Sequence, residues 1–285
     1  MKIVVTGGSG FVWSKIIEML YRVWSHTIIS CQRKKLSEKE GIIYKYFDHT
    51  TEVFREEIFT DIDVFIHCAS CVDYTKSLRH MLKQNVDSLK AISYISANAK
   101  HFLYISSSSV YQWFSWEITT NSIIDEKNLR NSYSYSKYMA EKYIQEYFKN
   151  PIITILRPRA IYWEWDTTLV PQVLKNSVLW YLLLPWNWKT LTSVTNIDKF
   201  CHYIFYIIHQ KIPGIHNFST DIMSYEEIYL KIKKDYHKKW ILHLPYSLLG
   251  FIWLFHRNKY SYLLDTFWNN KILINTNHSV DTINS

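Results

Sequence analysis

Short apolar runs alternate with amphipathic stretches over the first 160 residues of the chain. Runs of apolar and β-branched residues predict strands at 2–6, 26–31, 42–47, 63–68, 101–105 and 152–156. Between them, apolar residues spaced by about 3.6 positions predict helices, notably at 11–23, 74–98 and 131–148. This alternation predicts an α/β fold, a Rossmann-type doubly wound parallel sheet with helices on both faces.

The alternation loosens after residue 160. A turn is expected at 185–189, a helix at about 196–210 and further helices after residue 223. We therefore expect residues 1–160 to form the Rossmann domain, completed by segments within 190–222. Residues 161–285 are expected to form mostly a smaller C-terminal lobe.

The composition is that of an ordinary globular protein, with 48% hydrophobic and 20% charged residues. The net charge is +8, but the basic residues are scattered and accompany no nucleic-acid-binding motif, so a small anionic ligand is a sufficient partner. The sequence has no run of about 18 apolar residues, so no membrane span is predicted. The chain opens directly into a strand without a signal peptide, which favours a cytoplasmic location.

The four cysteines are too few for a disulfide framework in a chain of this size. Cys68 and Cys71 have the spacing of a redox pair or of half a zinc site, but no second pair completes a metal site. We favour two small residues at the end of a strand and expect no metal.

The N-terminal strand runs into the glycine-rich segment Thr6-Gly-Gly-Ser-Gly-Phe11, after which a helix is predicted. Gly7 allows a sharp turn, and Gly10 allows the backbone to approach a pyrophosphate at the helix N-terminus. The third position of such a motif is small so that helix and strand pack closely, whereas this chain has Trp13. The position of the motif favours a dinucleotide site over a glycine-rich turn without a ligand.

Twelve tryptophans and only six glycines are an unusual ratio, because glycine ordinarily supplies about 7% of residues. Several Trp occupy positions where a turn favours glycine, as at Trp24 and in Pro185-Trp-Asn-Trp188. We hypothesise that many or all of them are Gly in the natural protein, through a codon (UGA) whose meaning varies between genetic codes. The alternative is a naturally Trp-rich chain, and the intact mass of protein from the native source distinguishes the two.

Tyr133 and Lys137 are four residues apart in a predicted helix, so they share one face. An ammonium beside a phenol favours the phenolate and lowers a pKa that is otherwise about 10, which makes the tyrosine a usable acid or base. Tyr135 has no lysine at this spacing. Ser107 lies in a serine cluster that follows a strand, at the rim where ligands of such sheets bind. A solvated helix face is the alternative explanation of the Tyr–Lys pair.

These motifs occur in an order that resembles the extended short-chain dehydrogenases/reductases, the NAD-dependent epimerase/dehydratase group. The matching segments are Thr6–Phe11, Asp63–Ala69, Asn85-Val86, Ile105–Tyr111, Tyr133-x-x-x-Lys137 and Leu156–Tyr162. The resemblance covers the N-terminal 165 residues, and the segments are specific when taken together. The chain departs from the family at Gln112-Trp113 and Tyr162-Trp-Glu-Trp165, where the family has glycines. These departures fall on Trp again, and they put the shape of the pocket in doubt.

The resemblance implies roles for particular residues. The catalytic residues would be Ser107, Tyr133 and Lys137, with Ser108 the next serine to test. Ala69 would line the cofactor, Asp48 would lie near the adenine, and Asn85 would belong to the helix that orders an active-site water and the lysine. The full set of implied cofactor-binding residues is Gly7, Gly10, Phe11, Arg33, Asp48, Ala69, Asn85, Lys137 and Pro158.

The end of the second strand bears on the choice of cofactor. An acidic residue there would hold the ribose 2′-hydroxyl of NAD, but the segment Ser30-Cys-Gln-Arg-Lys34 has no carboxylate. Arg33 could instead pair with a 2′-phosphate, which favours NADP over NAD. The alternative is that Arg33 and Lys34 belong to a solvated loop.

The segment from Arg157 to Pro171 most resembles the 3β-hydroxysteroid-dehydrogenase-like branch. This resemblance implies an NAD(P)-dependent oxidoreductase that interconverts a secondary alcohol and a ketone by hydride transfer, with a small-molecule substrate in the C-terminal lobe. One alternative is a nucleotide-sugar epimerase or dehydratase on the same scaffold, and another is a non-catalytic dinucleotide-binding regulator. A homodimer is one option for its assembly.

Overall fold

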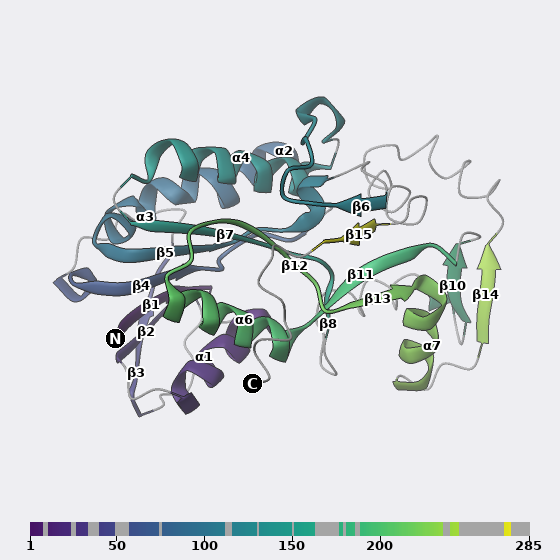
Figure 1. The fold of residues 1–285 in the computed structure, drawn as a ribbon, viewed down its shortest axis with the longest axis horizontal. Helices are drawn as coiled ribbons and strands as arrows, with labels where there is room; N and C mark the ends of the chain where they lie inside the picture. The colour runs from purple at the N-terminus through teal and green to yellow at the C-terminus, as the bar shows by residue number, and fades with distance from the viewer. Residues whose placement is uncertain are drawn as a thin grey trace.

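The computed structural model describes most of the chain, and Figure 1 shows its arrangement. The described residues are 1–7, 11–23, 27–33, 40–48, 57–73, 76–111, 116–129, 131–149, 151–162, 177–178, 181–185, 189–235, 240–244 and 271–274.

A seven-stranded parallel sheet forms the centre of the molecule, in the order β12-β7-β5-β4-β1-β2-β3 (Figure 1). Its strands are β1 (Lys2–Thr6), β2 (Thr27–Gln32), β3 (Ile42–Tyr46), β4 (Ile62–His67), β5 (Ala99–Ile105), β7 (Ile152–Pro158) and β12 (Gly214–Phe218). Apolar side chains of both sheet faces are buried, as the runs of Val and Ile predict for a parallel sheet. The predicted fold class is therefore confirmed.

Helices cover both faces of this sheet. On one face, α1 (Phe11–Val23) and α6 (Ile197–Gln210) pack with the strands in one buried cluster. On the other face lie α2 (Leu78–Leu82), α3 (Ser88–Ala97) and α4 (Ser132–Tyr147), and the last two share a second buried cluster with the strands (Figure 1). The helix predicted at 74–98 is observed as two α-helices, α2 and α3, joined by a π-helical turn (Lys83–Asp87).

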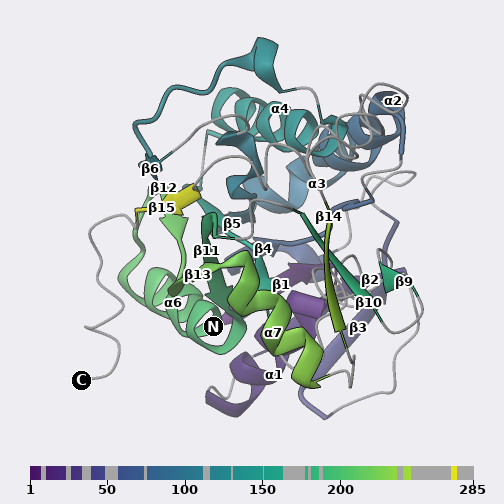
Figure 2. The same cartoon turned by 90° about the vertical axis from the view of Figure 1, so that its right-hand side faces the viewer.

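Two smaller sheets lie beyond the carboxyl ends of the large one (Figure 1). One has the order β13-β11-β15-β6, from Asp221–Ser224, Leu191–Asn196, Lys271–Leu273 and Trp116–Ile118, with β8 (Ile161–Tyr162) paired to β11. The other joins β14 (Trp240–Leu244), β10 (Tyr181–Pro185) and β9 (Ser177–Val178). Helix α7 (Tyr225–Asp235) lies close to this second sheet (Figure 2). Short 3₁₀ helices occupy Glu57–Phe59, Ser108–Tyr111 and Glu126–Asn128.

The division of the chain at residue 160 stays a prediction. Helix α6 and strand β12 follow that residue and belong to the layers of the large sheet. Within the described part of the chain, no helix combines the length and the apolar character needed to cross a membrane.

His101 is a buried histidine of β5 that the fold holds neutral. Its Nε2 donates to the Thr154 hydroxyl at 2.7 Å, because that hydroxyl already donates to the carbonyl of Ile212. Its Nδ1 has no hydrogen-bond partner in the described residues. Burial, with a smaller contribution from Lys211, lowers the pKa of His101 from 6.5 to about 4.

The unfolded chain therefore binds a proton at His101 between about pH 6.5 and pH 4, where the folded chain does not. We expect stability to fall by up to about 3 kcal/mol as the pH drops through this window. His101→Gln should remove this part of the pH dependence in urea titrations, whereas His209→Gln, at an exposed position of α6, should retain it. An unchanged pH dependence in His101→Gln would contradict the assignment.

Candidate active site

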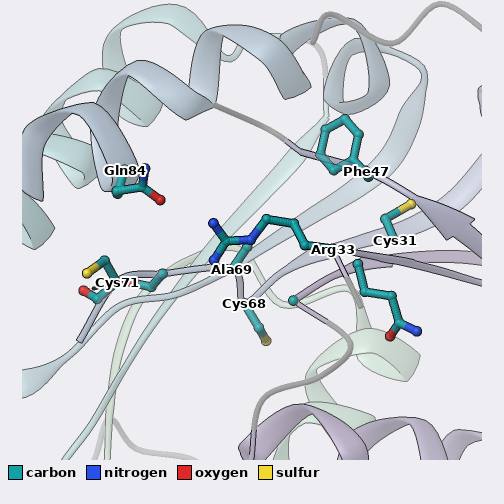
Figure 3. Close-up of a pocket in the computed structure, with 10 residues that line it drawn as sticks. Cys31, Arg33, Phe47, Cys68, Ala69, Cys71 and Gln84 are labelled. Atoms are coloured by element: carbon teal, nitrogen blue, oxygen red, sulfur yellow. Dashed lines mark hydrogen bonds between the residues drawn. The ribbon is translucent and has the colours of Figure 1, made fainter. Parts of the chain in front are cut away.

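A pocket opens at the carboxyl ends of three neighbouring strands, β1, β2 and β4 (Figure 3). Its lining consists of Gly7, Cys31–Arg33, Phe47, Cys68–Cys71 and Gln84. Ligands of open α/β sheets bind in the crevice outside the carboxyl ends of the strands. The pocket therefore occupies the place that the glycine-rich motif predicts for a dinucleotide, and Gly7, Arg33 and Ala69 line it.

Gly7 makes the sharp turn at the end of β1. Its φ of +93° is a conformation that side chains rarely adopt. A Cβ here would lie 2.8 Å from the backbone nitrogen of Ala69. Only glycine allows β1 and the loop after β4 to approach this closely, and such a cradle fits the pyrophosphate turn of a dinucleotide site.

Two residues at the end of β2 line this pocket, Gln32 and Arg33. The Gln32 side chain is 4% exposed, and its Nε2 has no partner among the residues described. Arg33 is exposed, and its side chain extends across the pocket (Figure 3). Donors at this strand end fit a phosphate better than a ribose hydroxyl.

Asn85 joins the wall of the pocket to helix α4. Its Oδ1 accepts hydrogen bonds from the Cys71 N–H (2.7 Å) and the Ser70 hydroxyl (3.1 Å). Its Nδ2 donates to the Cys71 carbonyl (3.1 Å) and to Ser136 Oγ (2.9 Å). The π-helical turn contains Asn85, and such turns are frequent at functional sites. Asn85 thereby fixes the pocket loop to the helix that carries Tyr133.

Helix α4 places Tyr133 and Lys137 on one buried face. The helix begins after Asn131, whose side chain accepts hydrogen bonds from the N–H groups of Tyr133 (2.9 Å) and Ser134 (3.2 Å). Tyr133 is 6% exposed and Lys137 is 2% exposed. Their spacing of one turn agrees with the sequence motif.

The ammonium of Lys137 lies against strand β5. Its Nζ donates to the carbonyl of Ile105 at 2.8 Å and to the hydroxyl of Tyr104 at 3.2 Å. Burial lowers the pKa of Lys137 from 10.5 to about 8, while Cys68 and Glu141 act in the opposite direction. The ammonium form is therefore present at neutral pH, where it favours the phenolate of a tyrosine on the same helix face.

Ser107 lies two residues after Ile105, the last residue of β5, and is half-buried. Its Oγ accepts a hydrogen bond from the N–H of Ser109 at 3.1 Å. Ser108 begins the following 3₁₀ helix and is 4% exposed. Ser107 is thus the more accessible of the two candidate serines.

A buried ion pair, Arg157–Glu141, lies next to the serine segment that contains Ser107. Arg157 of β7 donates through Nε to Glu141 of α4 at 3.0 Å, and the two side chains are 4% and 1% exposed. Ser106 donates to the same carboxylate, and Arg157 also donates to the hydroxyl of Tyr111. Burial alone would lower the pKa of Arg157, but Glu141 raises it above its usual value. The pair ties α4 and β7 to the segment that follows β5, beside Ser107.

The remaining implied cofactor residues are less closely grouped. Asp48 is half-buried just after β3, and Pro158 is the last residue of β7, two strands away from β4. Gly10 lies outside the described residues, and only the backbone of Phe11 is described, at the start of α1. The side chains of all twelve Trp also lie outside the described residues, so the codon hypothesis stays a hypothesis.

Several residues of the site were not selected from the sequence. The position of Gln32 beside Arg33 was the available signal for it. For Glu141 the available signal was its spacing of one helical turn from Lys137, which places a carboxylate on the same helix face. Nothing in the sequence pattern points to Gln84 or Tyr104.

The fold and this arrangement define a dinucleotide-binding α/β protein of the extended short-chain dehydrogenase/reductase superfamily. The model of an NAD-binding family described as "Male sterility protein" matches residues 50–208, more than half of the chain, and the chain belongs to this family.

The chain is similar to named enzymes in sequence and in fold. It is 29% identical over 160 residues to an ADP-L-glycero-D-manno-heptose-6-epimerase of Brachyspira hyodysenteriae, over 52% of this chain and 49% of that one. It is 27% identical over 155 residues to the enzyme of the same name from Alkalilimnicola ehrlichii, over 51% and 48%. These matches span about half the length of the relatives.

Solved structures share the fold at lower identity. The UDP-glucuronic acid 4-epimerase of Bacillus cereus in complex with NAD superposes with a TM-score of 0.71 at 19% identity, over 86% of this chain and 87% of that one. A dTDP-glucose 4,6-dehydratase of Streptomyces venezuelae with NAD bound gives 0.68 at 15% identity, over 86% and 84%.

These findings confirm the expected family, whose members the glycine-rich and Tyr-x-x-x-Lys segments resemble. They favour the alternative made from the sequence, an epimerase or dehydratase, over an alcohol–ketone oxidoreductase. The narrower 3β-hydroxysteroid-dehydrogenase-like branch finds no support in these relatives.

Proposed function

We propose that this protein is an NAD(P)-dependent epimerase or dehydratase of a nucleotide sugar, in which a secondary alcohol and a ketone of the sugar are interconverted. The observation that carries the proposal is the placement of Tyr133 and Lys137 on one buried face of α4. This face is held next to the strand end that bears Ser107, since Lys137 bonds the carbonyl of Ile105. The named relatives support the nucleotide-sugar class of substrate.

In this proposal the chain's own residues transfer one proton and stabilise the negative charge that develops on the sugar oxygen. Tyr133, as phenolate, would take the proton of the sugar hydroxyl and return it when the ketone is reduced. Ser107 would donate a hydrogen bond to the oxygen on which negative charge develops. Lys137 would keep the phenolate accessible near neutral pH. A bound nicotinamide would supply the hydride acceptor and donor, and Gly7, Ala69 and Arg33 would hold the dinucleotide.

Product analysis on a panel of nucleotide sugars tests this function. The protein with its dinucleotide would be incubated with ADP-, UDP- and dTDP-hexoses and heptoses, and the sugars analysed by NMR. We expect inversion at one carbinol carbon, or loss of water, in at least one of them. Reduction of simple ketones alone would instead favour the alcohol–ketone oxidoreductase. Dinucleotide binding without any turnover would identify a regulator.

The finer cofactor preference that we propose is NADP. Arg33→Ser should weaken NADPH binding by about tenfold or more, because a charge-assisted bond to the 2′-phosphate is lost, and should leave NADH binding within about twofold. The measurement is a titration of reduced-nicotinamide fluorescence. Arg22→Ser, which removes an exposed cation from α1, is the matched control. Equal weakening of both dinucleotides by Arg33→Ser would contradict the preference.

A further inference from the structure

Three polar side chains form a row across the large sheet under helix α4. Thr6 of β1 is in register with His67 of β4, and His67 is in register with Tyr104 of β5. Thr6 Oγ1 and His67 Nδ1 are 2.7 Å apart, within hydrogen-bonding distance. The rings of His67 and Tyr104 are stacked, with centroids 5.8 Å apart and planes 16° from parallel. The row begins next to Gly7 and ends at Lys137.

All three residues of this row are deeply buried. Thr6 and His67 are 0% exposed and Tyr104 is 1% exposed. Tyr104 belongs to the buried cluster shared with α3 and α4, so the row is on that face of the sheet. Polar groups buried this deeply are costly unless each has a partner, and here the partner of the Tyr104 hydroxyl is the ammonium of Lys137.

Tyr104 contacts Lys137 in two ways. Its hydroxyl accepts a hydrogen bond from Nζ at 3.2 Å, and its ring centroid lies 4.7 Å from Nζ, within the range of a cation–π contact. The second hydrogen bond of Nζ goes to the carbonyl of Ile105, the next residue of the same strand. The backbone of Lys137 therefore belongs to α4, while two residues of β5 fix the position of its ammonium group.

We propose that Tyr104 is a positioning residue for Lys137. Tyr104 holds the Lys137 ammonium in place and in its charged form, while His67, itself next to Thr6, fixes the Tyr104 ring from the other side. The role of Lys137 in turnover rests on the function proposed above, whereas its contact with Tyr104 does not. Tyr104 itself would touch neither substrate nor dinucleotide.

Other titratable groups around Lys137 also affect its pKa and have to be considered in a test. Burial is the main cause that lowers the pKa of Lys137, and Cys68, from the loop after β4, and Glu141, on α4 itself, oppose it. Tyr133 is on the same helix face, and burial raises the pKa values of both Cys68 and Tyr104. Both groups therefore stay protonated and neutral at neutral pH. Glu141 is paired with Arg157.

The decisive variant is Tyr104→Phe, which removes one oxygen and keeps the ring on His67. Without its acceptor the ammonium loses stabilisation, so the pKa of Lys137 should fall by about one unit. Because the unfolded chain keeps a lysine pKa near 10.5, stability rises with pH above the folded pKa. This rise should begin about one pH unit lower in Tyr104→Phe than in the unmodified protein. Urea titrations between about pH 6 and 9 measure it without any substrate.

Two further variants make the result specific. Lys137→Met should abolish the rise, both alone and combined with Tyr104→Phe. Tyr203→Phe is the matched control, since it removes a buried hydroxyl that has no hydrogen-bond partner within the described part of the chain, on a ring stacked against Phe218. It should leave the onset of the rise unchanged. An onset in Tyr104→Phe that equals that of the unmodified protein, or a shift of equal size in Tyr203→Phe, would overturn the proposal.

Turnover provides the second readout. Tyr104→Phe should lower kcat about fivefold at pH 8 and less than twofold at pH 6.5, since the charged fraction of Lys137 falls mainly at the higher pH. A loss that is equal at the two pH values would indicate a merely structural role and contradict the proposal. If no nucleotide sugar is turned over at all, the proposed function fails, while the stability shift still tests Tyr104.

Discussion

Tyr133→Phe is expected to lower kcat by about 10²- to 10⁴-fold, because the variant retains the ring but has no proton to give or take. The affinity for the dinucleotide should stay within about threefold, since the pocket residues at the ends of β1, β2 and β4 are untouched. Steady-state kinetics on the nucleotide sugar found in the panel, together with fluorescence titration of the dinucleotide, measure the two quantities.

The matched control for this variant is Tyr135→Phe in the same helix. Tyr135 is half-exposed, and its hydroxyl donates to Glu126 at 3.1 Å. Its removal should change kcat less than twofold. Retention of a third or more of the activity in Tyr133→Phe would contradict the assignment of Tyr133 as the acid and base.

Glu141→Gln is expected to lower the free energy of unfolding by about 3 kcal/mol or more, because it leaves the Arg157 guanidinium buried without its counter-charge. The amide also cannot accept both the Arg157 fork and the Ser106 hydroxyl as the carboxylate does. Urea unfolding at neutral pH measures the change.

Glu146→Gln, at an exposed position of the same helix, is the control for this prediction. Surface substitutions of this kind usually change stability by less than about 0.5 kcal/mol. A loss below about 1 kcal/mol in Glu141→Gln would mean that the pair is better solvated than its 1% and 4% exposure indicates.

Six of the seven strands of the large sheet were predictable from the sequence because each is a short apolar or β-branched run bounded by polar residues, whereas β12 (Gly214–Phe218) was not predicted as a strand. The bounds of β1, β2 and β4 agree with the prediction within one residue. Strands β6 and β15 were not predictable, because three residues carry no measurable periodicity and their pairing joins distant parts of the chain. The helix predicted at 74–98 has the right location, but the sequence pattern did not predict the π-helical turn that contains Asn85.

The candidate site was predictable where chemistry dictates spacing. Gly7 requires a positive φ, and Tyr133 and Lys137 require one helical turn, so both leave a signal in the sequence. Tyr104 and Gln32 leave almost none, because their roles depend on which strands are neighbours and on how deeply each side chain is buried. The choice between branches of the superfamily was open for a related reason: the substrate class depends on the C-terminal part of the chain, where the motifs are weak.

The most direct test of the account is the near-ultraviolet absorbance of nicotinamide after the protein, saturated with oxidised dinucleotide, is mixed with nucleotide sugars. We expect reduced nicotinamide to appear transiently with at least one sugar in the unmodified protein and to be absent in Tyr133→Phe, because the hydride taken from the sugar is returned to the ketone within each turnover. Equal appearance of reduced nicotinamide in both proteins, or sugar turnover in Tyr133→Phe equal to that of the unmodified protein, would contradict the assignment of Tyr133 and Lys137 to catalysis.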